Sequence, residues 1–475
     1  MWVAKLVNSS ERPFGLLLCN YVSNQGAVVV ESINAFLDYS RIPYHIYSLN
    51  YGFSEDFNFD FFDFIVIHYS IIPSLPGFLS AGVIERIRRF KGLKLQMIQD
   101  DYRMNSLLLN FIKHCGIDVV YTVAPPPAAK ALYTDQVPGL DVETYLTGYI
   151  SQWLRLEKPL PLRKRSFHVG YRGRKYPYWF GQPVIDKIEV AEAFAKKLTK
   201  NHLKHNMSTR ERDRVYGRAW VDFLRNCRAI FGMESDIHYV DPFGYVHHWY
   251  DSIEKLKGKK DWDRKDALQN PFFDEHARPA PASFAVIPPR VFEAIAVRSA
   301  NVLLEGHYSG VVEPWRHYIP LKKDLSNVED VIRALQDEAL LIDIISVSFA
   351  EIAQNRKYTY EGFTDQIDRT IERHLGGRLI TSKCSKRPAK KSFVATVDPS
   401  QDGPHMGQAE NAKEIEVART VGQQLASEIG HMQQLAPFYY IQNPNSIRVE
   451  NPSTWNFKRV LRRVLANCLR FVRPR

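Results

Sequence analysis

The first 150 residues alternate short, almost wholly apolar runs with longer amphipathic segments, and this alternation restricts the possible folds more than any other feature. Strands that are apolar along their whole length have both faces buried, as in a parallel sheet covered by helices on two sides. We therefore predict an α/β domain over residues 1–155. Its strands are expected at FGLLLCNYV, YHIYSLN, DFIVIHYS, LKLQMIQD and IDVVYTV, with helices between most of them.

A second series of strand and helix signals follows a link rich in Leu, Pro and Arg. SFHVGYRGR and RAIFGMESD are predicted strands with polar ends, and PPRVFEAIA is predicted to begin a helix at Pro289 before a strand at Ala300. Further helices are expected around 190–200, 328–337 and 340–355. These signals predict a second α/β domain over residues 156–380.

The last hundred residues have a different character. Residues 381–408 are polar and rich in Lys, Pro and Ser, which predicts an exposed linker before a helical extension over 409–475. From Trp455 the apolar residues recur at helical spacing and the opposite face is basic, with no acid from Lys458 onward. Such a helix fits the plane of an anionic membrane surface, and docking on the protein's own core is the alternative. The predicted membrane residues are Trp455, Phe457, Lys458, Arg459, Arg462 and Arg463.

Composition narrows the cellular setting. The net charge of +11 indicates an anionic partner: a nucleotide, a membrane surface or a nucleic acid. The five scattered cysteines form no CxxC pair, so neither a disulfide framework nor a structural zinc site is expected. The sequence shows neither a signal peptide nor a membrane-spanning run, so we expect a cytoplasmic protein that contacts membranes only peripherally.

Ligands of open α/β sheets bind at the carboxyl ends of the strands, so polar residues there are the candidates for chemistry. In the first domain His68 ends one predicted strand and Asp101 follows another. Either side chain is suited to act as a base or to polarise a hydroxyl group. The alternatives are an ordinary hydrogen-bonded histidine and an aspartate that caps the next helix.

The corresponding residues of the second domain suit a nucleotide. GYRGR places Arg172 and Arg174 beside two glycines after a strand, which matches the oxygens of a pyrophosphate; a glycine turn with solvated arginines is the alternative. Glu293, near the start of a predicted helix, is suited to a ribose diol, or else caps that helix. His238, His247 and His248 match no zinc spacing, so no metal and no cofactor are expected.

Several stretches resemble group 1 GT-B glycosyltransferases, particularly the subfamily with spore-maturation-type and surface-polysaccharide members. The resemblance covers about Phe14 to His374 and is carried by PPRVFEAIAVRSANVLLEGHYSGVVEPWRHYIPLKKDLSN, VYGRAWVDFLRNCRAIFGMESD, HVGYRGR and LQMIQDDYR. It implies a GT-B fold, in which two Rossmann-like domains turn their parallel sheets toward a cleft. It also implies that the acceptor binds mainly to the first domain and the donor nucleotide mainly to the second.

The same resemblance implies roles for individual residues. Glu293 would hold the donor ribose, Arg172 and Arg174 the pyrophosphate, and Glu234 the donor sugar. The loop that would line the nucleotide pocket contains Tyr308, Ser309 and Gly310. The family motif usually has two glutamates eight positions apart, whereas Ala285 occupies that position here. The role of Glu234, and whether the anomeric configuration is retained or inverted, therefore stay open.

The implied activity is transfer of a sugar from a nucleotide sugar to a lipid-linked or polysaccharide acceptor, without an essential metal. The implied setting is bacterial cell-surface glycan synthesis, such as that of lipopolysaccharide, on the inner face of the plasma membrane. A GT-B-fold nucleotide-sugar epimerase is an alternative that would turn over without an acceptor. A nucleic-acid-binding protein is less favoured, because the excess basic charge lies in the tail and linkers and no DNA- or RNA-binding module is present.

Overall fold

The computed structural model describes residues 14–21, 26–51, 53, 57–75, 77–256 and 271–376, all within one compact unit, Met1–Pro399. The predicted linker 381–408 and the predicted extension 409–475, with its membrane residues, lie outside the described residues.

The first sheet has six strands in the order β2-β1-β3-β4-β5-β6, and every pair is parallel. The strands are β1 (Gly15–Cys19), β2 (Tyr44–Ser48), β3 (Phe64–Ile67), β4 (Leu93–Ile98), β5 (Val119–Thr122) and β6 (Asp141–Thr144). The first five match the predicted apolar runs. The edge strand β6 was not predicted, because its sequence DVET is polar and only partly buried.

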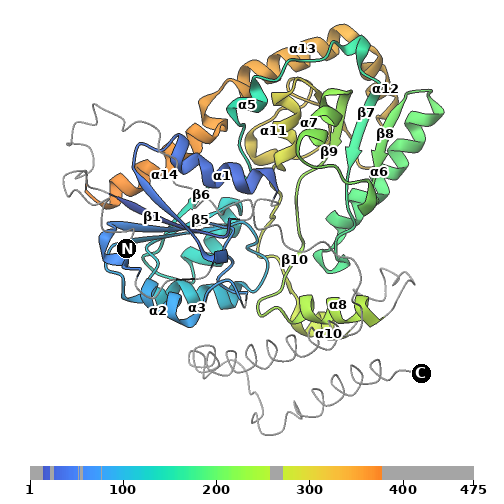
Figure 1. Ribbon diagram of the computed structural model, residues 1–475. Coiled ribbons are helices and arrows are strands. Elements are labelled where there is room, and N and C mark those ends of the chain that lie inside the picture. Colours follow the sequence, from blue (N-terminus) through green and yellow to red (C-terminus); the bar gives the residue numbers. More distant parts are fainter. Residues whose placement is uncertain are drawn as a thin grey trace, which may run out of the picture. The chain divides into compact units, whose positions relative to one another are not determined.

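Helices cover both faces of this sheet (Figure 1). Alternate strand residues point to opposite faces, so Leu16 and Leu18 pack with α2 (Ala81–Arg89) and α3 (Asn105–Cys115). Leu17 and Cys19 pack on the other side with α1 (Ala27–Asp38) and α14 (Tyr360–His374). Every residue of β1, β3, β4 and β5 is buried, as the continuous apolar runs require.

The second sheet has five parallel strands in the order β13-β12-β9-β7-β8. The strands are β7 (Phe167–Arg172), β8 (His205–Ser208), β9 (Cys227–Gly232), β12 (Ala300–Leu304) and β13 (Ile319–Leu321). One face packs against α6 (Gln182–Lys200), α12 (Val328–Gln336) and α13 (Glu338–Ser348), and the other against α7 (Gly217–Arg225) and α11 (Pro289–Ala296).

The polar stretch after β9 contains regular structure. It includes α8 (Tyr245–Leu256), α10 (Pro271–His276) and a short antiparallel pair, β10 (Tyr239–Val240) with β11 (Arg278–Pro279). Val246 and Phe273 bury their side chains in the same cluster as α2 and α3. The short helix α4 (Pro126–Ala129) lies between β5 and β6 of the first sheet, and α5 (Gln152–Arg155) lies in the connection between the two sheets.

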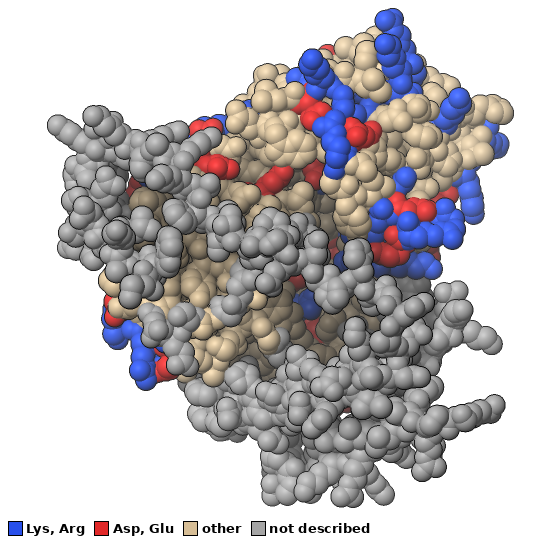
Figure 2. Space-filling view, in the orientation of Figure 1, with Lys and Arg blue, Asp and Glu red and all other residues tan. Residues whose placement is uncertain are grey.

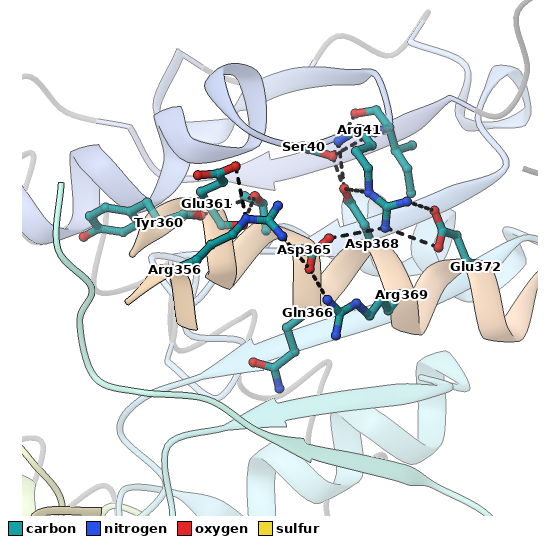
Figure 3. A network of polar contacts seen from close by, with 12 residues as sticks. Ser40, Arg41, Arg356, Tyr360, Glu361, Asp365, Gln366, Asp368, Arg369 and Glu372 are labelled. Carbon is teal, nitrogen blue, oxygen red and sulfur yellow. Dashed lines mark hydrogen bonds and ion pairs between the residues drawn. The ribbon is translucent and has the colours of Figure 1, made fainter. Parts of the chain in front are cut away.

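The last described helix, α14, returns to the first sheet although it follows the second sheet in sequence. Phe363 lies against Phe36 and Tyr149, with ring centroids 5.6 and 5.0 Å apart. Polar contacts fix the helix in place (Figure 3). The buried carboxylate of Asp368 accepts hydrogen bonds from the Ser40 hydroxyl and the Arg41 amide, both at 2.7 Å.

These observations confirm the predicted fold class, an α/β protein with two parallel sheets covered by helices. Within the described part of the chain, no helix is both long enough and apolar enough to span a bilayer.

Candidate functional site

Both sheets reverse their strand order at the same place, next to their first strand. β1 lies between β2 and β3, and β7 lies between β8 and β9. At such a point the connections that follow two neighbouring strands run to opposite sides. This opens a crevice at the carboxyl ends of those strands. In the second sheet this point lies between Arg172, at the end of β7, and Gly232, at the end of β9.

Three cationic side chains gather beside this point. The guanidinium of Arg174 lies 4.4 Å from the Tyr176 ring centroid, and the Lys187 ammonium lies 5.4 Å from the same ring. Arg290 lies 5.4 Å from the centroid of the neighbouring Tyr171 ring. We call Arg174, Lys187 and Arg290 the cation cluster.

The cation cluster lacks ion-pair partners among the described residues. None of its members forms an ion pair with another described residue, and Asp236 is the one acid that raises the pKa of Lys187. Burial, together with the positive charges of Arg290 and Arg174, lowers that pKa to about 8. Arg290 also lies in the first turn of α11, where the helix dipole favours negative charge. The arrangement therefore favours a polyanion such as a diphosphate.

Arg172 is directed elsewhere. Its guanidinium donates to the backbone oxygen of Asn206 at 2.7 Å and to the Asn206 side chain at 2.9 Å. It also lies 4.2 Å from the centroid of the Phe223 ring. The geometry therefore does not favour the predicted contact of Arg172 with a pyrophosphate. Its backbone oxygen instead accepts a hydrogen bond from Arg290 at 2.8 Å, so Arg172 helps to position the cation cluster.

Glu234 and the loop after β12 form a single arrangement. Tyr308, Ser309 and Gly310 all have left-handed backbone conformations, with φ of 50°, 54° and 68°. Glu234 Oε1 accepts the backbone N–H of Tyr308 at 2.6 Å. A Cβ atom on Gly306 would lie 2.4 Å from Glu234 Oε2, so a larger residue at this position would displace the carboxylate. Glu234 thus holds a strained loop at the edge of the second sheet, close to where the sequence predicted a nucleotide pocket.

Glu293 lies on α11 and is half-buried. Its Oε2 atom accepts the indole N–H of Trp220 at 2.9 Å. Burial raises the pKa of Glu293, whereas Trp220 and Arg290 lower it. Arg290 belongs to the cation cluster, so the structure brings the predicted ribose ligand and a diphosphate-favouring group onto one helix.

His68 is enclosed by the protein at the end of β3. Its Nδ1 atom accepts the backbone N–H of Ser70 at 3.1 Å, which places the ring proton on Nε2, 3.0 Å from the Ser32 hydroxyl. The side chain is fully buried, and burial lowers its pKa to about 3. This geometry supports the alternative of a neutral, hydrogen-bonded histidine and leaves neither ring nitrogen facing a ligand.

Asp101 is also buried, at the carboxyl end of β4. Its Oδ1 atom accepts hydrogen bonds from the hydroxyl groups of Thr122, at 2.6 Å, and Tyr133. Its Oδ2 atom is buried and accepts none from the protein. Burial raises the pKa of Asp101 to about 6. His68 and Asp101 thus follow strands of the first sheet, whereas Glu234 follows a strand of the second sheet and Glu293 lies on a helix that packs on it.

A cavity of about 200 Å³ opens at the carboxyl edge of the first sheet. Apolar side chains such as Ile71, Pro73 and Met97 line most of it, and Asp100 and Arg103 supply polar groups. It is suited to a small ligand with an apolar part. Among the described residues, no set of three or more His, Cys, Asp or Glu side chains is grouped as metal ligands would be.

Sequence reasoning missed three residues at these sites. Lys187 and Arg290 lie within helices rather than directly after strands, which is where candidates were sought. Glu31 lies on α1 and accepts the indole N–H of Trp153 at 2.7 Å. Each of the three lies near the amino end of a helix that follows a strand or loop at the sheet edge, and that position was the available signal.

Comparison with known proteins gives similarities only among solved structures. No protein-family model and no curated protein matches the chain. HepE of Anabaena in complex with UDP-glucose is 9% identical with a TM-score of 0.43, covering 77% of this chain and 100% of that one. An alpha-glucosyltransferase in complex with UDP and a 13-mer DNA is 9% identical with a TM-score of 0.44, covering 76% and 99%. Sucrose-phosphate synthase from Thermosynechococcus elongatus is 9% identical with a TM-score of 0.41, covering 77% and 100%. All three TM-scores lie below 0.5.

Proposed function

We propose that the protein transfers a sugar from a nucleotide-sugar donor to an acceptor. The observation that carries the proposal is the cation cluster of Arg174, Lys187 and Arg290, which lies beside the strand-order reversal of the second sheet without an ion-pair partner among the described residues. A nucleoside diphosphate supplies the negative charge that this cluster lacks. The same cations would stabilise the diphosphate as it leaves, so the proposal needs no metal ion.

The two sheets would divide the substrates between them. Glu293, on the same helix as Arg290, is placed to accept hydrogen bonds from the hydroxyl groups of the donor. The cavity beside Ile71, Met97 and Asp100 is the candidate acceptor site, and its largely apolar lining favours an acceptor with an apolar part. This agrees with a lipid-linked or polysaccharide acceptor in bacterial cell-surface glycan synthesis, at the inner face of the plasma membrane, as the motif resemblance implies.

The proposal is tested by calorimetric titration with UDP, GDP, TDP, ADP and CMP. We expect one diphosphate to bind to the wild type, and Lys187→Met and Arg290→Lys to weaken it by roughly tenfold or more, because each change removes or displaces a charged donor. Affinity should also fall as the pH rises above about 8, where Lys187 loses its proton. Lys196→Met, an exposed change on the same helix, is the matched control and should leave binding unchanged.

Two results would contradict the proposal. The first is that the wild type binds none of the five nucleotides. The second is that Lys187→Met weakens the binding of the free nucleoside as much as the binding of its diphosphate, since the cation cluster would then not contact the phosphates. Conversion of a nucleotide sugar without an acceptor would instead favour the epimerase alternative.

A further inference from the structure

Glu31 and Glu293 are two half-buried carboxylates, on different elements, that each accept a hydrogen bond from an indole. The indole N–H of Trp153 donates to Glu31 Oε1 at 2.7 Å, and that of Trp220 donates to Glu293 Oε2 at 2.9 Å. Neither carboxylate forms an ion pair with a described residue. In each carboxylate, one oxygen accepts a hydrogen bond from an indole and the other oxygen does not.

The short helix α5 links the two elements that carry the carboxylates. The Thr147 hydroxyl, just before α5, donates to the backbone oxygen of Ile287, just before α11. A Cβ atom on Gly148 would lie 2.9 Å from Cβ of Pro289, the first residue of α11. Trp153 lies on α5 and binds Glu31 of α1, so α1, α5 and α11 meet at one place. The negative charge of Glu293 reaches Glu31 there and contributes to raising its pKa.

We propose that Glu31 and Glu293 together form a clamp that accepts hydrogen bonds from neighbouring hydroxyl groups of a bound sugar. The inference rests on the proposed function, because it takes the ligand to be the donor nucleotide sugar. Two carboxylates without an ion-pair partner among the described residues match a ligand that offers two neutral donors, and vicinal hydroxyl groups do so. The hydroxyl groups belong either to the ribose or to the sugar that is transferred. One ligand would then bind both to α1 of the first sheet and to α11 of the second.

The test compares ligands that differ by one hydroxyl group. The nucleoside diphosphate that binds to the wild type and its 2′-deoxy form are titrated into wild type, Glu31→Gln, Glu31→Ala and the control Asp38→Asn. Asp38 is an exposed acid on the same helix. We expect Glu31→Ala to reduce the preference for the ribose form by roughly tenfold, Glu31→Gln to reduce it less, and Asp38→Asn to leave it unchanged.

A second arm identifies the source of the hydroxyl groups. If Glu31→Ala keeps the ribose preference but loses the preference for the nucleotide sugar over the diphosphate, the clamp holds the transferred sugar, which also supports the inference. If both preferences are unchanged in a variant with the wild-type melting temperature, the inference is overturned. It is also overturned if EDTA abolishes the preference in the wild type, since the pair would then hold a cation.

Failure of the inference is distinguishable from failure of the proposed function. Loss of diphosphate binding in Lys187→Met beside normal hydroxyl preferences in Glu31→Ala would overturn the clamp and leave the transferase proposal standing. A wild type that binds no nucleotide would overturn both.

The clamp also has a pH signature. Burial raises the pKa of Glu31 to about 7, and an ionised carboxylate accepts hydrogen bonds more strongly than a protonated one. The titratable groups around Glu31 are Glu293, Tyr39, Tyr69 and Tyr360, and burial raises the pKa of each tyrosine above its usual value of 10. The preference for the hydroxyl-bearing ligand should therefore rise between about pH 6 and pH 8 in the wild type. It should be flat over this range in Glu31→Gln, and a parallel rise in that variant would overturn the role of Glu31.

Discussion

Burial determines the chemistry of His68 more than its position at a strand end does. The structure encloses the ring, fixes its proton on Nε2 and lowers its pKa to about 3. The unfolded chain has a histidine pKa of about 6.5. Between these two values the unfolded chain binds more protons, so acidification through this window destabilises the fold.

This difference gives a prediction for His68→Gln. Lowering the pH from 7 to 5 should reduce the free energy of unfolding of the wild type by about 2 kcal/mol more than it reduces that of the variant. Asp101 and Asp368, whose pKa values burial raises to about 6, contribute with the opposite sign in both proteins and cancel in the comparison. Urea unfolding at the two pH values measures the difference. His114→Gln, an exposed change, should behave as the wild type; equal acid sensitivity of His68→Gln and the wild type would refute the buried neutral ring.

At the residue scale, the sequence predicted the regions that contain candidate site residues better than it predicted which side chains contact one another. Glu234 and the loop from His307 to Gly310 were predicted from their places after strands, and the structure joins them by a hydrogen bond. Arg172 and Arg174 lie two positions apart in the same motif, yet only Arg174 joins the cation cluster. The direction of an arginine side chain depends on Asn206 and Phe223, which are distant in sequence, so no local pattern predicts it.

At the scale of elements, helix α14 shows what periodicity misses. The buried strands were predictable because both faces of a parallel sheet need apolar residues, and β1, β3, β4 and β5 are apolar throughout. The short polar strands β6 and β8 give no such signal. Helix α14 has a strong apolar face. Which sheet that face covers depends on packing partners that are distant in sequence, such as Phe36 and Tyr121.

Phe363→Ala tests how much the packing of α14 on the first sheet stabilises the protein. Phe363 is 1% exposed and packs between α1 and the first sheet. Removing its ring should lower the free energy of unfolding by about 3–5 kcal/mol, because the surrounding aromatic residues cannot fill the cavity. Denaturation in urea measures the loss. Arg369→Ala, on the exposed side of the same helix, should cost less than about 1 kcal/mol, and similar losses in the two variants would contradict the packing role.

At the scale of the whole molecule, charge and substrate class are connected. On the face shown in Figure 2, lysine and arginine side chains gather over the part of the chain that carries the second sheet. This surface is suited to attract an anionic donor before it reaches the cation cluster. The sequence predicted an anionic partner from the net charge of +11, but the total charge carries no information on where the charges lie.

The predicted membrane helix gives a further test at this scale. Deleting residues from Trp455 onward removes the basic amphipathic segment and should release the protein from anionic liposomes, because attraction to acidic lipids contributes about 1 kcal/mol per basic residue near the surface. Co-sedimentation with vesicles of mixed zwitterionic and anionic lipid measures this, with purely zwitterionic vesicles as the control. Unchanged binding of the truncated chain to anionic vesicles would exclude this segment as the anchor.

The return of α14 to the first sheet also fixes the order in which the protein can be completed during synthesis. The ribosome releases β1 to β6 long before it releases residues 360–374, which cover one face of those strands. Until then Leu17, Phe64 and Val66 lack part of their apolar cover. The first sheet is thus synthesised first, but one of its faces is covered last. A chain that stalls within the second sheet exposes this apolar face to chaperones or to other nascent chains.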